Sequence, residues 1–345
     1  MEINKILLNL VNKKNLNFPE NFDWELFYCK LRENELNILF YEELRKKKYS
    51  VPKKLKEQLK KDYKKFKVFR QSLDFFLKIT KENKISNYTI IKLKNIPKAH
   101  TDLDILTTKE NITKLYNILT KKGFKVKDNL GFEIGLRKKV TGGEIVIDMH
   151  SKIDYNNSSF IDSQRVLEDK KIISYLDKKI PFVSPEDDFM INLVHCFFQK
   201  LGVRRTKGFN KLRWSEITLS DLVQLKEDSE SKNFDWSYVI KTSKKYGWKN
   251  ALTYCLMILN HFFPSDERVK IISKITPKSK VAYYNDIHSF NDLPFYTSIF
   301  EMYLISLSKL GNELNNGFFK GVKYFYNTHK WFFSNGLRVI YHYIF

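Results

Sequence analysis

The chain has 345 residues, of which 43% are hydrophobic and 15% aromatic, with only 12 Gly and 8 Pro. This composition excludes an intrinsically disordered chain and favours a helix-rich protein of two or three compact units. The 61 Lys and Arg residues against 39 Asp and Glu residues leave a net charge of +22, which favours phosphate-bearing partners or an anionic membrane surface. Lysines spread over solvated faces would give the same charge.

Three cysteines, Cys29, Cys196 and Cys255, lack the C-x-x-C spacing of a zinc cluster, and their odd number argues against a disulfide framework. The first ten residues include Glu2 and Lys5 and do not form the apolar stretch of a secretory signal. No apolar run approaches the roughly 18 residues that a membrane span needs. We therefore expect a cytoplasmic protein.

Helical periodicity dominates residues 1–84, which we expect to form an N-terminal helical region. Apolar residues recur there at spacings of three and four, as they do on one face of a helix. Pro52 is expected to start a long helix over residues 53–84, with an apolar stripe on one side and lysines on the other.

Between residues 85 and 182 the pattern changes to short β-prone runs with one helix among them. Thr107, followed three residues later by Glu110, is expected to cap this helix, and Gly123 to end it. We expect residues 154–182 to be a polar connection. The expected strands cover residues 88–91, 103–106, 132–136 and 145–149, and the last two form a hairpin through Thr141-Gly142-Gly143.

Residues 183–345 are expected to form a C-terminal helical domain, which Ser184 and Pro185 open as cap and first turn. From Leu314 onward no residue is acidic, and aromatic residues alternate with basic ones. We interpret this tail as the docking face of a terminal helix, with base stacking or peripheral membrane contact as alternatives. The expected fold class is α/β (α+β): a small mixed-sheet core at 85–182 between two helical regions.

The strongest candidate for chemistry is the acidic pair on the second expected strand. Asp102 and Asp104 lie two residues apart, so they would point to one face of the strand about 7 Å apart and could share divalent cations. Asp148 alternates with Ile147 and Met149 on another expected strand and could supply a third carboxylate. Mg²⁺ prefers such oxygen ligands. Ordinary solvated acids on a strand are the alternative.

These motifs resemble the uncharacterised nucleotidyltransferases of the DNA polymerase beta-like superfamily, over roughly residues 20 to 260. The resemblance implies that Asp102, Asp104 and Asp148 hold two Mg²⁺ ions and that the substrate is a nucleoside triphosphate such as ATP. The Gly-Ser or Lys-Gly pair usual before the first acid is absent here, although Lys92 is retained. The resemblance rests on Ile90-Ile91-Lys92, Asp102-Leu103-Asp104, Ile147-Asp148-Met149-His150, Pro185-Glu186-Asp187, His195 and Asp221-Leu222.

Several cations could hold the phosphates of a nucleotide. Lys92 could act as a point charge, and Arg204, Arg205 and Lys207 lie in a basic loop that could clamp a nucleotide or an RNA backbone, unless it is simply solvated. We predict a Mg²⁺-dependent nucleotidyltransferase, of the EC 2.7.7 type, that moves a nucleoside monophosphate to an unidentified acceptor, RNA being one candidate. The alternative is a catalytically inactive basic module that binds RNA or an anionic membrane surface.

Overall fold

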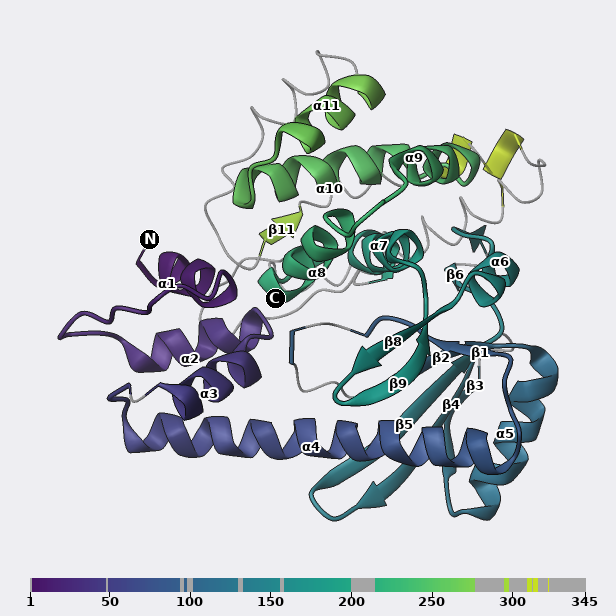
Figure 1. Cartoon of the computed structure of the whole chain (residues 1–345), viewed down its shortest axis with the longest axis horizontal. Helices are drawn as coiled ribbons and strands as arrows, with labels where there is room; N and C mark the ends of the chain where they lie inside the picture. Colours follow the sequence, from purple (N-terminus) through teal and green to yellow (C-terminus); the bar gives the residue numbers. More distant parts are fainter. Residues whose placement is uncertain are drawn as a thin grey trace, which may run out of the picture. The chain divides into compact units, whose positions relative to one another are not determined.

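The computed structural model describes residues 2–47, 49–93, 96–97, 102–129, 133–155, 158–199, 215–276, 295–297, 309–311, 313–315 and 322 (Figure 1). The chain divides into two compact units. The first comprises Met1–Ile153, Asp162–Asp188 and Thr218–Gln224, and the second comprises Asp154–Ile161, Phe189–Ile217 and Leu225–Phe345. The three-part division at residues 84 and 182 stays a prediction.

Four helices open the first unit: α1 (Glu2–Val11), α2 (Trp24–Glu33), α3 (Asn37–Lys46) and α4 (Lys53–Glu82). The expected long helix is confirmed as α4, which begins directly after Pro52. Burial of its apolar stripe stabilises it, at about 1.5–3 kcal/mol for each large side chain removed from water. The buried stripe includes Leu55, Leu59, Phe66, Phe69, Leu73 and Phe76.

A seven-stranded mixed sheet forms the centre of the first unit, so the expected α/β class is confirmed (Figure 1). Its strand order is β3-β4-β5-β2-β1-β9-β8. The pairs β2·β5 and β1·β9 are parallel, and the other neighbouring strands are antiparallel. Helix α4 packs against β5 and β2, α5 (Lys109–Lys121) against β4, and α6 (Ser163–Glu168) against β2. The strands are β1 (Tyr88–Ile90), β2 (Leu103–Thr107), β3 (Lys125–Asn129), β4 (Glu133–Val140), β5 (Gly143–His150), β8 (Lys171–Tyr175) and β9 (Lys178–Phe182).

The cap of α5 lies one residue later than the sequence predicts. Thr107 is the last residue of β2 and donates a hydrogen bond to the Asn87 carbonyl, whereas Thr108 accepts from the Asn111 amide as the N-cap. Two adjacent threonines offer the same capping hydroxyl, and pairing of Thr107 with Tyr88 on β1 decides between them. Gly123 follows the C-cap with φ +86, so its expected role in ending the helix is confirmed.

The expected polar connection at 154–182 is wrong, because this segment contains α6, the β8–β9 hairpin and the short pair β6 (Asp154–Tyr155) and β7 (Ser158–Ser159). Leu176 and Asp177 form the turn between β8 and β9 with φ +47 and +66. Tight hairpin turns need such positive φ values and usually place Gly or Asn there. Without those residues the hairpin carries no turn signal in the sequence.

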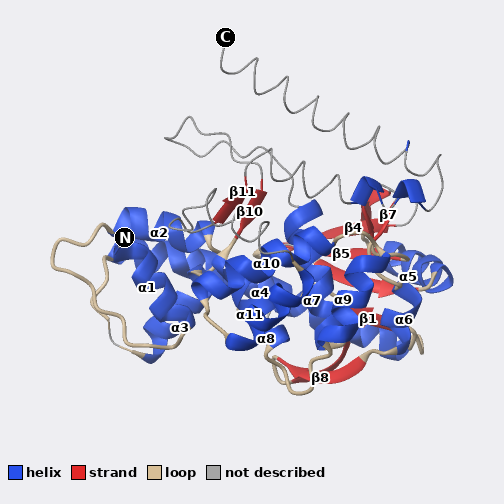
Figure 2. Cartoon of the chain, turned by 90° about the horizontal axis from the view of Figure 1, so that it is seen from above, coloured by secondary structure: helices blue, strands red, loops and turns tan. Residues whose placement is uncertain are grey.

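The described part of the second unit is mostly helical (Figure 2). Trp248, fully buried just before α10, donates from its ring nitrogen to the Phe160 carbonyl at 2.9 Å. Ser184 accepts from the Asp187 amide, which confirms the expected cap of α7. Most of the aromatic tail lies outside the described residues. The remaining elements are α7 (Pro185–Val194), the π-helix η1 (His195–Gln199), β10 (Ser215–Ile217), α8 (Leu219–Ser229), α9 (Trp236–Lys245), α10 (Lys249–Phe262), α11 (Asp266–Ile275) and β11 (Phe295–Thr297), with the division between units falling inside α7 and α8.

Among the described residues, none of the helices combines the length and the apolar character that crossing a bilayer requires.

Candidate functional site

The register of two parallel strands brings the predicted acids together. On β2 and β5, Asp104 lies opposite Asp148 and Leu106 opposite His150. Side chains of paired residues on neighbouring strands share one face of the sheet, with their Cβ atoms about 5 Å apart. Asp102 directly precedes β2 and is partly exposed, and its negative charge reaches the carboxyl of Asp148. The acidic pair at the start of β2 and the distant Asp148 on β5 therefore lie close together.

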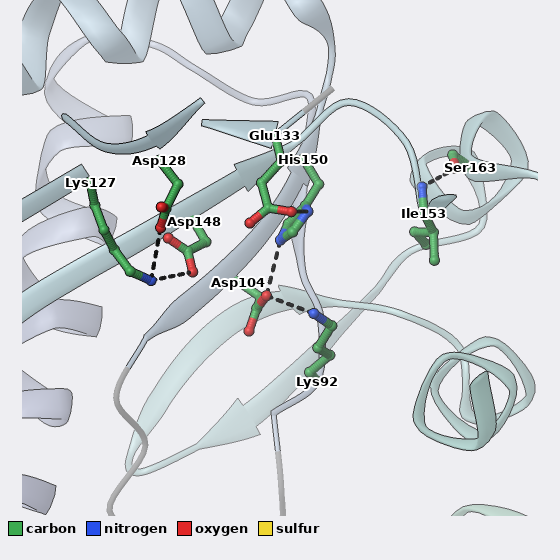
Figure 3. Close-up of polar contacts among 9 residues, drawn as sticks. All are labelled: Lys92, Asp104, Lys127, Asp128, Glu133, Asp148, His150, Ile153 and Ser163. Atoms are coloured by element: carbon green, nitrogen blue, oxygen red, sulfur yellow. Dashed lines mark hydrogen bonds and ion pairs between the residues drawn. The ribbon is translucent and has the colours of Figure 1, made fainter. Parts of the chain in front are cut away.

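Two basic side chains hold the carboxylate of Asp104 (Figure 3). The Lys92 ammonium donates to Oδ1 at 2.9 Å, and His150 Nε2 lies 3.0 Å from the same oxygen. Lys92 follows β1 with φ +57, a conformation that a non-glycine residue adopts only at a cost of about 1–3 kcal/mol. Burial alone would raise the pKa of Asp104, but Lys92 and His150 hold it far below its usual value. Asp104 is therefore a partly buried anion at neutral pH.

His150 also contacts Glu133, which the sequence analysis did not identify. Its Nδ1 lies 3.5 Å from Glu133 Oε2, and Glu133 is opposite His150 in the pairing of β4 with β5. An ionised carboxylate can only accept hydrogen bonds. The ring of His150 can therefore donate to Asp104 and Glu133 at the same time only when Nε2 and Nδ1 each carry a hydrogen. Glu133 and Asp104 thus fix the ring of His150 from two sides.

Asp148 is less well compensated than Asp104. Its side chain is buried, yet Oδ1 finds no hydrogen-bond donor among the residues that the structure describes. Its Oδ2 lies 3.5 Å from the ammonium of Lys127. Burial, followed by the charge of Asp104, raises the pKa of Asp148 to about 6, although Lys127 opposes this. An added cation or hydrogen-bond donor would stabilise the ionised form.

Lys127 and Asp128 on β3 complete the cluster. The Lys127 ammonium is 3.5 Å from Asp128 Oδ2 as well as from Asp148. Burial disfavours its charge, but Asp148, Asp102 and Asp128 together raise the pKa of Lys127. Neither residue was expected from the sequence, because the run Lys125-Val126-Lys127-Asp128-Asn129 has a single apolar residue and gives no apolar alternation that would predict a strand.

The carboxylates suit a magnesium ion chemically but do not form a ready-made metal cage. Within the described ranges, no group of three or more Asp, Glu, His or Cys side chains is arranged to hold a metal ion. Asp104 is turned towards Lys92 and His150, and Asp148 towards Lys127. Oxygen donors are the ligands that Mg²⁺ prefers, and Asp148 Oδ1 is a buried acceptor in need of a partner. A bound metal ion would therefore replace the side chains of Lys92, His150 and Lys127 as the partner of these carboxylates.

Three predicted residues lie outside the described part of the chain: Arg204, Arg205 and Lys207. Their role in holding phosphate stays a prediction. Lys92 is described, and it contacts Asp104 directly.

Comparison with known proteins gives one family. The family model described as "Uncharacterised nucleotidyltransferase" matches residues 20–264, a segment that contains the whole seven-stranded sheet. No curated protein matches the chain. Among solved structures, the lincomycin-bound crystal structure of lincosamide antibiotic adenylyltransferase LnuA is similar at 16% identity with a TM-score of 0.30, over 46% of this chain and 96% of that chain.

Proposed function

This chain belongs to the uncharacterised nucleotidyltransferase family, and we propose that it is a Mg²⁺-dependent enzyme that transfers a nucleoside monophosphate from a nucleoside triphosphate. The acceptor oxygen forms a bond to the α-phosphorus, the bond from that phosphorus to the bridging oxygen breaks, and pyrophosphate leaves with the electron pair. The acceptor hydroxyl releases its proton to water in the same reaction. Asp102, Asp104 and Asp148 are the proposed metal ligands.

One observation carries this proposal: the parallel pairing of β2 with β5 sets Asp104 directly opposite Asp148. The carboxylates of the buried Asp148 and the partly buried Asp104 repel each other, and the pKa of Asp148, raised to about 6, reflects that repulsion after its burial. A buried acceptor without a donor costs about 1–3 kcal/mol. Such an arrangement is unfavourable for folding and favourable for binding cations.

The proposed roles of the other residues follow from their contacts. Two Mg²⁺ ions, when bound, would neutralise charge on the reacting phosphate and orient the attacking oxygen. Lys92, released from Asp104, would hold a phosphate oxygen as a point charge, and Arg204, Arg205 and Lys207 would add further cations. His150 would keep the carboxylate of Asp104 in one orientation, because its Nε2 contacts that carboxylate while its Nδ1 contacts Glu133.

The acceptor is left open by this proposal. RNA as acceptor, ATP as the physiological nucleotide, a cytoplasmic location and peripheral membrane contact through the C-terminal tail are predictions from the sequence alone.

The test compares the native protein with Asp104→Asn and with Asp74→Asn as a matched control. Asp74 is an exposed acid on α4 that pairs with Lys178. Isothermal titration with Mg²⁺ and ATP, and pyrophosphate release with RNA, sugars and small antibiotics as acceptors, are measured for all three. We expect Asp104→Asn to lose at least about 100-fold in metal affinity and turnover, with Asp74→Asn unchanged.

Equal Mg²⁺ binding by the native protein and Asp104→Asn, together with no pyrophosphate release for any nucleotide and acceptor, would contradict the proposal.

A further inference from the structure

An irregularity in β3 lies at Lys127, beside the acids. In the pairing of β3 with β4, Val126 lies opposite Leu136 and Asp128 opposite Gly135, so the register shifts by one residue and Lys127 is the extra residue of a β-bulge. Bulges re-aim a side chain and are common next to active sites. Val126 shares a face with its partner Leu136, whereas Gly135 shares the other face with Asp148. Alternation after Val126 therefore turns Lys127 to the face of Asp148, and the bulge sets Asp128 on that face beside it, opposite Gly135.

A glycine on the strand between them leaves room for this contact. Strand β4 separates β3 from β5, so two strand spacings, roughly 9–10 Å, lie between the backbones that carry Lys127 and Asp148. Gly135 on β4 is opposite Asp148. A Cβ atom at residue 135 would lie 2.8 Å from Asp148 Oδ1 and 3.7 Å from the Cβ of Asp128. Any side chain there would fill the space between the two carboxylates that Lys127 contacts.

The two lysines beside the acids differ in how firmly they are held. Lys92 donates to Asp104 at 2.9 Å and its side chain is 17% exposed, whereas Lys127 is 3.5 Å from each of its carboxylates and 35% exposed. Charge-assisted hydrogen bonds are about 2.7–2.9 Å long, so the contacts of Lys127 are loose. The ammonium of Lys127 therefore has donors available for a ligand that approaches from solvent.

We propose that Lys127, which reaches across Gly135 to the acids, binds a phosphate group of the nucleotide. The sheet order sets Lys127, from β3, and Lys92, after β1, on the two sides of the acids on β5 and β2. A polyphosphate lying over the acids would then meet a cation at each side. That the ligand is a nucleotide rests on the proposed function. That Lys127 belongs to a phosphate site rests on the geometry alone.

The test uses Lys127→Met, Lys127→Arg and, as a matched control, Lys125→Met, an exposed lysine on the same strand. Isothermal titration measures ATP and inorganic tripolyphosphate in the presence of Mg²⁺, adenosine, and Mg²⁺ alone. We expect Lys127→Met to weaken ATP and tripolyphosphate about tenfold and to raise KM more than it lowers kcat, because one charge-assisted contact is lost. Lys127→Arg should restore most of the affinity, and Lys125→Met should bind like the native protein.

Mg²⁺ alone separates this role from a structural one. Without Lys127 the carboxyl of Asp148 loses a competing cation, so Mg²⁺ should bind as tightly as before or more tightly. A parallel loss of Mg²⁺ and tripolyphosphate affinity would make Lys127 a structural counter-ion and overturn the inference.

Failure of the inference and failure of the proposed function give different results. Unchanged ATP affinity in Lys127→Met, with turnover still lost in Asp104→Asn, overturns only the inference. Lys127-dependent binding of tripolyphosphate without any pyrophosphate release supports the phosphate site and contradicts the enzyme. A native protein that binds no phosphate compound overturns both.

Discussion

Two buried aspartates in the first unit, Asp62 among the helices and Asp148 in the sheet, differ in how their charge is met. Asp62 on α4 accepts from the Tyr28 hydroxyl at 3.0 Å and from the Asn37 amide at 2.8 Å. Asp148 has only a distant ammonium at 3.5 Å, and its Oδ1 is without a donor in the described chain. Buried polar groups are normally satisfied, so an unsatisfied one marks a place where a ligand is expected.

The second unit also contains a buried charge whose hydrogen bonds are made, the fully buried ammonium of Lys309. Lys309 donates to the carbonyls of Ser159 and Tyr246 at 2.9 and 2.6 Å and pairs with Glu313 at 2.8 Å. Its ammonium also lies 4.6 Å from the centre of the Phe160 ring. Burial lowers the pKa of Lys309, and Glu313 opposes that shift. A charge matched in this way serves the fold, whereas the charges around Asp148 leave capacity for binding.

The largest expected effect is on function at Asp148. Asp148→Asn removes a proposed metal ligand and should reduce pyrophosphate release at least about 100-fold. It should leave the free energy of unfolding unchanged or raise it in the absence of metal, because a neutral amide needs less hydration than a poorly compensated carboxylate. Thermal unfolding with and without Mg²⁺ and ATP checks both statements. A large loss of stability without ligand would show that Asp148 is a structural residue like Asp62.

Lys309→Met tests the matched charge of the second unit. It removes the ammonium that Glu313 and two partly buried carbonyls share, and breaking a buried ion pair costs about 3–5 kcal/mol. We expect this loss in the free energy of unfolding from urea denaturation. Lys245→Met is the control, because that lysine carries its charge over the ring of Tyr246 at an exposed position. If Lys309→Met were as stable as the native protein, the contacts of Lys309 would not stabilise the fold, and the contrast with Asp148 would fail.

Asp62→Ala tests the satisfied aspartate. It leaves the Tyr28 hydroxyl and the Asn37 amide without their acceptor, so we expect a loss of about 2 kcal/mol. Asp62→Asn keeps one side-chain oxygen as an acceptor and should lose less. ATP and Mg²⁺ affinities, measured well below the unfolding temperature, should stay at native values in both variants. Reduced ligand affinity in the folded Asp62→Ala protein would break the distinction between the two aspartates.

Gly135→Ala tests whether the space beside Asp148 is needed for binding. The added methyl would meet Asp148 Oδ1 at 2.8 Å, so the carboxylate must move. We expect affinity for both Mg²⁺ and ATP to fall on the order of tenfold, since misplaced ligands weaken binding by that amount. Gly311→Ala is the control, because a Cβ there meets nothing within 4 Å. Native affinity in Gly135→Ala would show that the space above Gly135 is not needed.

The smallest effect is a pH dependence at Tyr28. Burial and then the charge of Asp62 raise the pKa of Tyr28 from 10.0 to about 12. The folded state therefore keeps this proton between pH 10 and 12 while the unfolded state loses it, so the stability that Tyr28 contributes falls as the pH rises through that window. Tyr28→Phe should lose less stability between pH 9 and 11 than the native protein, as urea unfolding at each pH would show. An identical pH profile would contradict the raised pKa.

Local patterns in the sequence predict much of the fold and the acids of the candidate site. The 3.6-residue period predicts α4, and apolar alternation predicts β2 and β5 together with the face that carries Asp104 and Asp148. Where two signals are equivalent, as at Thr107 and Thr108, the sequence misplaces a boundary by one residue. Where the usual residue is replaced, as in the Leu176-Asp177 turn, it misses an element.

The sequence by itself determined most of the helices and the strands β1, β2, β4 and β5, and it singled out three acids as candidates, because these patterns depend on neighbours a few residues away. Only the tertiary structure decided that Glu133, His150 and Lys127 surround them, since strand order, register and the bulge in β3 are set by pairing between distant segments. Non-local pairing is also what makes Gly135 significant: its missing side chain matters only because Asp148 lies beside it on the neighbouring strand.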